Sequence, residues 1–301
     1  MDNIHIYKVV HTKEFLTKWR QFLQDIYNYR FYEEYVIIPT LFGKDLYSYM
    51  PLLNYTDIFS GNESDLLESS EGKLYQIRML NTEYKSFTAN DTVDMRVDIS
   101  SSNLDFIFNN VFTSRKCRNQ IRKAEKSGVI SKSSNDKKFI NDFYTLYKKN
   151  MLNHGTPMFG IDFFYKLNQH IECDFIVTYM DKTPMSSVVI IYDDKLSLAM
   201  WSGIDSNYLG YCPNHSMYWK AIELAIHKEK IIFDFGRSAY DSYTYRFKKQ
   251  WGAKPIKIDI IKPNMDNIYK KYKFASTLWK KLPVGVSEYF GPKLCKYLGD
   301  L

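Results

Sequence analysis

Apolar side chains in the first third of the chain follow helical and strand periods in different segments. Between residues 12 and 26 they recur every three or four positions, which predicts an amphipathic helix. Strand-like patterns occur at residues 4–10, 73–80 and 91–99. The polar residues 60–72 between these segments predict a loop.

The rest of the chain alternates between helical and strand patterns. Two turn sequences, DKTP and DDK, separate three apolar stretches, which predicts an antiparallel meander. The predicted elements, in chain order, are a helix within 115–129 that ends at Gly128, helices at 141–154 and 161–171, strands at 174–180, 185–192 and 195–204, a helix around 218–226, a strand at 231–235, a helix at 243–251 and a strand at 255–261. This order predicts a mixed α/β fold.

The length of 301 residues is sufficient for two domains of ordinary size. A basic helix and the polar residues 131–138 after it separate the two halves of the pattern. We therefore predict an N-terminal domain over 1–132, which ends in the basic helix, and a C-terminal domain over 133–301.

Composition and charge narrow the class of protein. Hydrophobic residues make up 45% and charged residues 25%, which is typical of a packed globule. The net charge is +7, and ten lysines against four acidic residues lie from Lys254 to the C-terminus. This basic segment also contains aromatic residues, so it is suited to RNA, a lipid-linked phosphate or a membrane surface. A solvated helix face has the same composition, so both interpretations stay open.

Cysteine spacing and hydropathy indicate the compartment. The four cysteines show no C-x-x-C spacing, which predicts neither a zinc site nor a disulfide framework. The N-terminus lacks the basic and apolar regions of a signal peptide, and no apolar run has the length of a membrane span. We expect a cytoplasmic protein without a metal and without a DNA partner.

One motif carries a family resemblance. The segment IIFDFGRSAYDSYTYRFKKQWGAKP, from Ile231 to Pro255, resembles the signature of FemAB-like proteins, in which a strand ends in a D-F-G-R-S turn and an aromatic, basic helix and W-G follow. The helix from Arg118 to Val129, the G-T-P turn at Gly155 and the terminal WKKLPVGVSEYFGPKLCKYL agree with it. The first 90 residues match the pattern only weakly.

The resemblance is to the FemAB-like branch of the GNAT superfamily, including FemAB-related proteins of exosortase and polysaccharide-export systems. It implies two tandem GNAT-like (acyl-CoA N-acyltransferase-like) domains. It also implies transfer of an acyl or aminoacyl group to an amine, commonly on a cell-envelope precursor.

The acyl donor is left open by a departure from the family pattern. Acetyl-CoA-dependent GNAT enzymes bind pyrophosphate at a Q/R-x-x-G-x-G/A turn that begins a helix, where backbone N–H groups favour anions. The equivalent segment here reads SNYLGYCPNHS, with a single glycine and a proline that removes one donor. Acyl-CoA, acyl-carrier protein and aminoacyl-tRNA are therefore all retained as donors.

Acyl transfer to an amine requires a proton acceptor and donors for the developing oxyanion. Asp234, near the end of an apolar strand, is the candidate acceptor, and Arg237 is the candidate anion-binding residue. The alternative is that these two form a structural ion pair or cap the next turn. His215, at a helix start, is a candidate base or oxyanion donor. On the catalytic interpretation, Asp234→Asn abolishes turnover with little loss of stability.

Further binding candidates lie near the D-F-G-R-S turn and in the basic helix. Cations around the turn are suited to phosphate groups. Two aromatic residues are candidate cleft walls, although such rings are more often part of a core. The arginines of the basic helix lie on one stripe with a spacing suited to a phosphate or RNA backbone. The predicted substrate-binding residues are Arg237, Ser238, Tyr245, Lys248, Lys249, Trp201, Arg118 and Arg122.

The function implied by the resemblance is an N-acyltransferase acting on a cell-envelope or polysaccharide precursor, with an anionic or lipid-linked glycan as acceptor. The first alternative is an aminoacyl-tRNA-dependent transferase of the FemAB type. The second is a non-catalytic GNAT scaffold that binds anionic glycan intermediates or a membrane. We expect the protein in the cytoplasm, with contact to the inner membrane face through the C-terminal basic segment.

Overall fold

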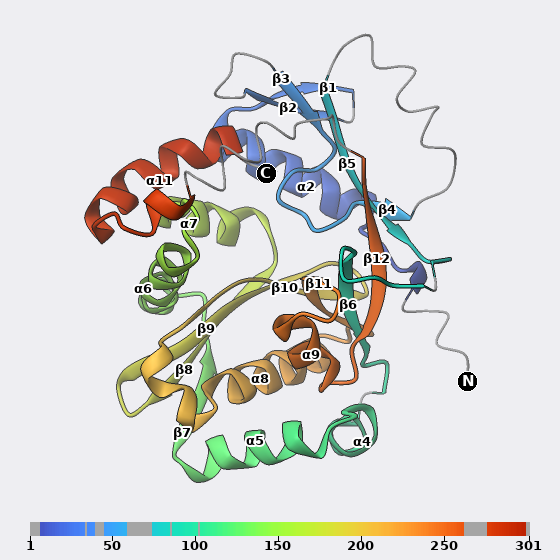
Figure 1. Ribbon diagram of the computed structural model, residues 1–301, viewed down its shortest axis with the longest axis vertical. Coiled ribbons are helices and arrows are strands. Elements are labelled where there is room, and N and C mark those ends of the chain that lie inside the picture. The colour runs from blue at the N-terminus through green and yellow to red at the C-terminus, as the bar shows by residue number, and fades with distance from the viewer. Residues whose placement is uncertain are drawn as a thin grey trace.

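A single large sheet organises the computed structural model (Figure 1). The structure describes residues 7–33, 35–39, 45–58, 74–84, 86–101, 103–261 and 276–298. The strands are β1 Arg30–Tyr32, β2 Tyr35–Pro39, β3 Asp45–Ser48, β4 Asp57–Ile58, β5 Leu74–Asn81, β6 Thr92–Asp98, β7 Val129–Ser133, β8 Cys173–Met180, β9 Thr183–Tyr192, β10 Leu196–Ile204, β11 Ile232–Ala239 and β12 Lys254–Ile261. Their order is β1-β2-β3-β5-β12-β6-β11-β10-β9-β8-β7, and β4 pairs with β5.

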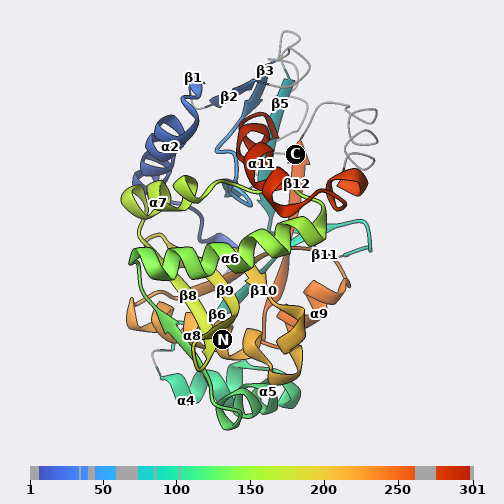
Figure 2. The same cartoon turned by 90° about the vertical axis from the view of Figure 1, so that its left-hand side faces the viewer.

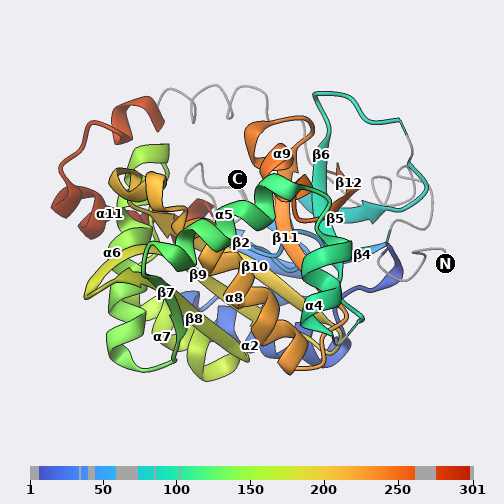
Figure 3. The ribbon, with the colours of Figure 1, turned by 90° about the horizontal axis from the view of Figure 1, so that it is seen from below.

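Helices cover both faces of this sheet. They are α2 Lys13–Tyr27, α4 Leu104–Phe106, α5 Arg115–Lys126, α6 Lys137–His154, α7 Ile161–His170, α8 Pro213–His227, α9 Tyr243–Lys249 and α11 Val284–Leu298, with a π-helical turn η1 at Ile107–Val111 and a 3₁₀ helix η2 at Ser206–Tyr211. Figure 2 shows α6 across β8, β9 and β10. Figure 3 shows α8 on the opposite face, with α5 packed outside it.

Local sequence signals account for the positions of several helices. The Thr12 side chain accepts a hydrogen bond from the Phe15 N–H and caps α2, which confirms the helix predicted at 12–26. Ser114 caps α5 in the same way, and the helix ends just before Gly128, whose φ is +75°. The helices predicted at 141–154 and 161–171 are also present, as α6 and α7.

The predicted strand at 4–10 is wrong over its described part. Residues 7 and 8 form a helical turn, and residues 9–12 are irregular. Nη1 of Arg96 donates a hydrogen bond of 2.7 Å to the carbonyl oxygen of Val9. A backbone group bound in this way is satisfied without a neighbouring strand.

Other strands agree with the sequence patterns more closely. The strands predicted at 73–80 and 91–99 are β5 and β6, and the predicted meander is the antiparallel series β8-β9-β10. The short strands β1 to β4, strand β7 and helix α11 have no counterpart in the predictions. The loop predicted at 60–72 lies outside the described residues.

Strand β12 joins segments that are distant in the sequence. It pairs with β5 on one side and β6 on the other, both antiparallel. Strand β7 spans the predicted boundary between residues 132 and 133 and pairs with β8. The division into 1–132 and 133–301 therefore stays a prediction, while the sheet itself runs continuously through both segments.

The two faces of the sheet have different cores. One core packs α2, α6 and α7 against the sheet and includes the fully buried Trp19, Phe163 and Phe164. The other packs α5 and α8 and includes Phe112, Phe233 and Trp251. Because successive side chains of a strand point to opposite faces, β11 contributes to both cores.

Candidate functional site

The neighbouring strands β10 and β11 are parallel for only a short distance. Their pairing runs from Leu196 opposite Ile232 to Leu198 opposite Asp234 and then stops. Beyond this point β10 continues beside β9, and β11 continues beside β6. The two strands therefore part next to the D-F-G-R-S sequence, whose residues belong to β11.

The register of β11 shifts between Asp234 and Arg237, and a glycine makes this possible. Gly236 has φ +77°, a conformation that side-chain-bearing residues rarely adopt. A Cβ atom there would lie 3.0 Å from Nδ2 of Asn54. The bulge thus depends on both the backbone conformation and the absence of a side chain.

Asp234 is fully buried, and contacts within the chain engage both of its carboxylate oxygens. Oδ1 accepts a hydrogen bond of 2.6 Å from the Gly236 N–H. Oδ2 accepts one of 2.8 Å from the Tyr55 hydroxyl and lies 3.6 Å from Nε of Arg96. The carboxylate therefore holds the backbone of the bulge, which agrees with the alternative that Asp234 caps the next turn. The cation next to it is Arg96.

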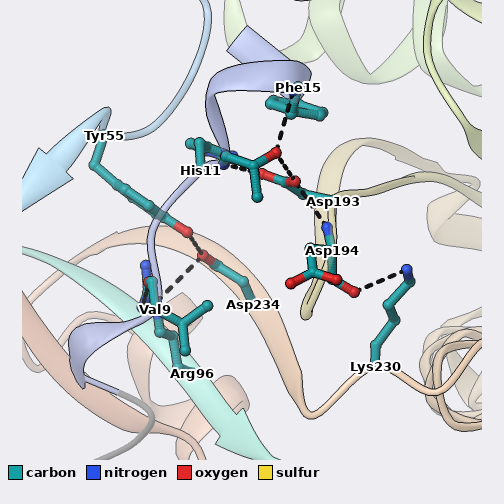
Figure 4. A network of polar contacts seen from close by, with 10 residues as sticks. Val9, His11, Phe15, Tyr55, Arg96, Asp193, Asp194, Lys230 and Asp234 are labelled. Carbon is teal, nitrogen blue, oxygen red and sulfur yellow. Dashed lines mark hydrogen bonds and ion pairs between the residues drawn. The ribbon is translucent and has the colours of Figure 1, made fainter.

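Strand β6 supplies the charges that surround Asp234. Arg96 lies opposite Asp234 in the antiparallel β6–β11 pair, so the two side chains share a face. Nε of Arg96 donates to Oδ2 of Asp94 at 2.9 Å, and its guanidinium lies 4.5 Å from the Tyr55 ring centroid. Tyr55, Asp94 and Arg96 are all fully buried. Figure 4 shows Tyr55 and Arg96 converging on Asp234.

Burial controls protonation in this cluster. It raises the pKa of Asp94 well above its usual value, and the charge of Asp234 acts in the same direction, while Arg96 opposes the shift. Burial likewise raises the pKa of Tyr55, so its hydroxyl keeps the proton that it donates to Asp234. The buried Asp94 therefore favours its protonated form more than an exposed aspartate would.

Lys248, from α9, holds the other side of the bulge. Its Nζ donates to the carbonyl oxygens of Gly236 at 3.0 Å and of Arg237 at 2.7 Å. The side chain is buried, and burial lowers the pKa of Lys248 to about 8. This lysine was predicted to bind substrate, but its ammonium group is directed to the backbone of the protein.

An N-terminal segment covers the same cluster. The His11 ring stacks on Tyr55 at 5.2 Å and on Phe15 at 4.7 Å. Its Nδ1 lies 3.1 Å from Oδ2 of Asp193, which also accepts from the Thr12 N–H at 2.9 Å. Figure 4 shows this continuous series of side chains from Asp193 to Asp234.

Other predicted binding residues around the turn have different exposures. Arg237 and Lys249 are exposed, whereas Ser238 is buried. Tyr245 is also buried and packs 4.8 Å from the Tyr240 ring. Arg237 and Lys249 therefore remain accessible to an anionic ligand, and Tyr245 contributes to packing.

His215 is not brought together with Asp234. Its ring stacks at 5.8 Å on Trp251, which belongs to the same core as Phe233 and Phe235. Asp234 lies between these two phenylalanines in the strand, so its side chain points to the other face. Burial, with a smaller contribution from Lys116, lowers the pKa of His215 to about 4. The two predicted catalytic residues thus belong to opposite faces of the sheet.

The remaining predicted residues, Trp201, Arg118 and Arg122, make contacts with other parts of the protein. Trp201, predicted as a cleft wall, instead packs in the aromatic core, 5.2 Å from Phe163 and 5.7 Å from Phe164. On α5, Nη1 of Arg118 donates to the Phe112 carbonyl at 2.5 Å. Arg122 is exposed, and its guanidinium lies 5.2 Å from the Phe108 ring centroid.

Sequence reasoning missed Tyr55, Asp94, Arg96 and His11. A signal was present in β6, whose sequence TVDMRVD has charged residues two positions apart among apolar ones. A charged pair on one face of a strand that is buried throughout is uncommon without a partner. That partner, Asp234, is distant in the sequence.

A groove on the protein surface is separate from the residues around Asp234. An open groove of about 830 Å³ lies on the outer side of α2, between Arg20 and Phe31, and is lined by none of the residues around Asp234. Within the described ranges, no group of three or more His, Cys, Asp or Glu residues is arranged to hold a metal ion. In the same part of the chain, no helix has both the length and the apolar character that crossing a membrane requires.

Comparison with known proteins defines the class of this fold. Residues 112–249 match the family model described as an acetyltransferase (GNAT) domain. This part of the chain, which contains β10, β11 and Asp234, is therefore similar to an acetyltransferase (GNAT) domain. The chain has a mixed α/β, GNAT-type acyltransferase fold, as the sequence predicted.

Two solved structures share this fold over most of the chain. The crystal structure of FemX is 13% identical, with a TM-score of 0.53, and the match covers 80% of this chain and 86% of that one. The C-terminal domain of an Agrobacterium fabrum protein described as a lysylphosphatidylglycerol synthetase is 9% identical, with a TM-score of 0.55, covering 87% and 97%. No curated protein sequence matches the chain.

Proposed function

We propose that the protein is an N-acyltransferase that transfers an acyl or aminoacyl group to an amine. The observation that carries the proposal is the end of the parallel β10–β11 pairing at Leu198 and Asp234, within the GNAT domain. Beyond that point, the backbone N–H and C=O groups on the β11 side of β10 pair with none of the described strands. An extended ligand can pair with such groups as a strand would.

This arrangement suits a donor whose acyl group is carried on an extended arm with amide groups. The arms of CoA and of acyl-carrier protein have this chemistry, and the GNAT fold commonly uses acyl-CoA. The exposed Arg237, beside the bulge, supplies a cation for an anionic part of the donor or acceptor. Asp234 and Lys248 act as positioning residues, because they hold the backbone from which Arg237 projects.

Binding and product formation test the proposal together. Purified protein is screened by thermal shift against acetyl-CoA, longer acyl-CoA, acyl-carrier protein and aminoacyl-tRNA, because a ligand that binds only the folded state raises the midpoint. A donor that binds is then incubated with amine acceptors, including amino sugars, and products are identified by mass spectrometry. One donor that gives an N-acylated product supports the proposal. No binding and no product with all four would overturn it.

A second candidate function is aminoacyl transfer from tRNA, and a specific contact favours it. The N-terminal end of α5 is attached to the end of α9 by the Thr113 hydroxyl, which donates to the Lys249 carbonyl at 3.0 Å. The exposed Arg115, Arg122 and Lys126 on α5 therefore continue the cationic surface of Lys249. Turnover that disappears after ribonuclease treatment would select this function.

An anionic acceptor fits the same proposal. A cell-envelope or polysaccharide precursor, including a lipid-linked glycan, would bring a phosphate to Arg237, and its amine would be the acceptor. A non-catalytic scaffold would bind such an intermediate without consuming a donor. Arg237→Gln distinguishes these cases, because loss of anion binding lowers both binding and turnover in an enzyme and only binding in a scaffold.

A further inference from the structure

Helix α11 packs on the protein through its small residues. Ser287, Gly291 and Cys295 recur every four positions and are buried. A Cβ atom on Gly291 would lie 2.8 Å from the carbonyl oxygen of Met158, so the helix backbone comes close to the segment after α6. The buried face of α11 therefore has little side-chain volume.

The opposite face of α11 presents its bulky residues to solvent. Val286 is 38% exposed, Tyr289 61% and Phe290 49%. With 3.6 residues per turn, these three share a face with Lys293, away from Ser287. In the segment before the helix, Leu278 is 52% exposed as well. A helix with small residues inside and aromatic residues outside leaves an apolar surface that the described part of the chain does not cover.

Cations frame this apolar surface. Residues 276–298 contain four lysines, at 280, 281, 293 and 296, and one acidic residue, Glu288. Glu288 is neutralised by Lys148 of α6, 2.9 Å away. Nζ of Lys293 lies 3.6 Å from the Tyr289 ring centroid, so charge and aromatic surface adjoin.

We infer that the outer face of α11 docks on a bilayer that contains anionic phospholipids. Exposed Tyr, Phe and Val side chains are suited to the boundary between headgroups and acyl chains, and lysines beside them are suited to anionic headgroups. A second copy of the chain is a less suitable occupant, because a twofold contact would place the two sets of lysines against each other. The inference does not depend on the proposed transferase activity.

Co-sedimentation with vesicles tests the apolar contribution. The full chain is mixed with vesicles of phosphatidylcholine, with or without an equal part of phosphatidylglycerol. We expect binding to the anionic vesicles and a loss of about tenfold in partitioning for the double variant Tyr289→Ser, Phe290→Ser. The matched control is Phe106→Ser, because Phe106 is also 49% exposed but lies on α4, at the far end of the molecule from α11 (Figures 1 and 2). This control should bind like the unaltered chain.

A second set of variants tests the charge contribution. Replacing Lys280, Lys281 and Lys293 by alanine, one after another, should weaken binding to anionic vesicles by about fivefold per lysine. Binding to neutral vesicles should not change. Because all of these side chains are exposed, the unfolding midpoint should remain that of the unaltered chain.

Three outcomes would overturn the inference. The first is that the unaltered chain remains in the supernatant with anionic vesicles. The second is that Phe106→Ser loses as much binding as the α11 double variant. The third is that light scattering without lipid reveals a dimer that the Tyr289→Ser, Phe290→Ser variant abolishes, which would assign the surface to a second copy.

Discussion

The hydroxyl group of Tyr55 donates a hydrogen bond of 2.8 Å to the carboxylate of Asp234, and neither side chain contacts solvent. Tyr55 follows the β-rich N-terminal segment, whereas Asp234 lies in the part of the chain that matches the GNAT family model. The bond therefore links the first part of the chain to the place where β10 and β11 part.

Tyr55→Phe removes this donor and leaves the rest of the ring in place. The buried carboxylate of Asp234 then loses one hydrogen bond, so the free energy of unfolding should fall by about 1.5–3 kcal/mol. Urea denaturation measures the change. An unchanged midpoint would show that another donor replaces the hydroxyl.

Asp234→Asn should be more damaging to stability than the sequence alone suggested. Removal of the carboxylate charge leaves Arg96 buried beside one acid, and breaking a buried pair costs about 3–5 kcal/mol. We expect a lower thermal midpoint together with reduced donor binding. Full activity and unaltered stability would contradict the positioning role.

Gly236→Ala tests the bulge, and Gly128→Ala is its control. Both glycines have positive φ, +77° and +75°, but a Cβ at Gly128 has no heavy atom within 4 Å. The control should cost about 1 kcal/mol of unfolding free energy for the backbone conformation alone. Gly236→Ala should lower the free energy of unfolding further, because the new Cβ would crowd the side chain of Asn54. Of the two substitutions, only Gly236→Ala should reduce activity. Equal effects of the two substitutions would dismiss the steric argument.

Lys248 should make stability depend on pH in the alkaline range. Its pKa is lowered from 10.5 to about 8 by burial, so between these values the unfolded chain holds the proton more strongly than the folded one. The contribution of Lys248 to the free energy of unfolding therefore rises by roughly 3 kcal/mol as pH increases from 8 to 10.5. Below pH 8 this contribution is constant. Tyrosines titrate in the same range, so the measured quantity is the difference between the unaltered chain and Lys248→Met in urea unfolding. Parallel pH curves for the two proteins would contradict this prediction.

His215 should be neutral at physiological pH. Its pKa is lowered from 6.5 to about 4, mainly by burial, so the unfolded state binds a proton first as pH falls. The contribution of this residue to stability is complete above pH 6.5 and is lost as pH falls toward 4. Proton NMR of the imidazole should give a titration midpoint near 4. A midpoint near 6.5 would place the ring in solvent instead of against Trp251.

Many elements and the GNAT class were predictable from the sequence. The helices α2 and α5 follow from their caps and from apolar residues at helical spacing. The meander β8-β9-β10 follows from turn residues between apolar stretches. The D-F-G-R-S sequence indicated the candidates Asp234 and Arg237, but it was predicted to be a turn at the end of a strand, whereas β11 continues through it to Ala239. Each of these signals is local, because capping and periodicity act over a few residues.

The partners of the candidate residues were decided by tertiary structure. Only the pairing of β6 with β11 places Arg96 opposite Asp234, and only the path of the N-terminal segment brings Tyr55 and His11 to them. The same pairing sends His215 to the other face of the sheet and directs Lys248 to backbone carbonyls. Strand register and side-chain burial are set by contacts between residues far apart in the chain, and a local sequence pattern contains no information about which distant strand will be the neighbour.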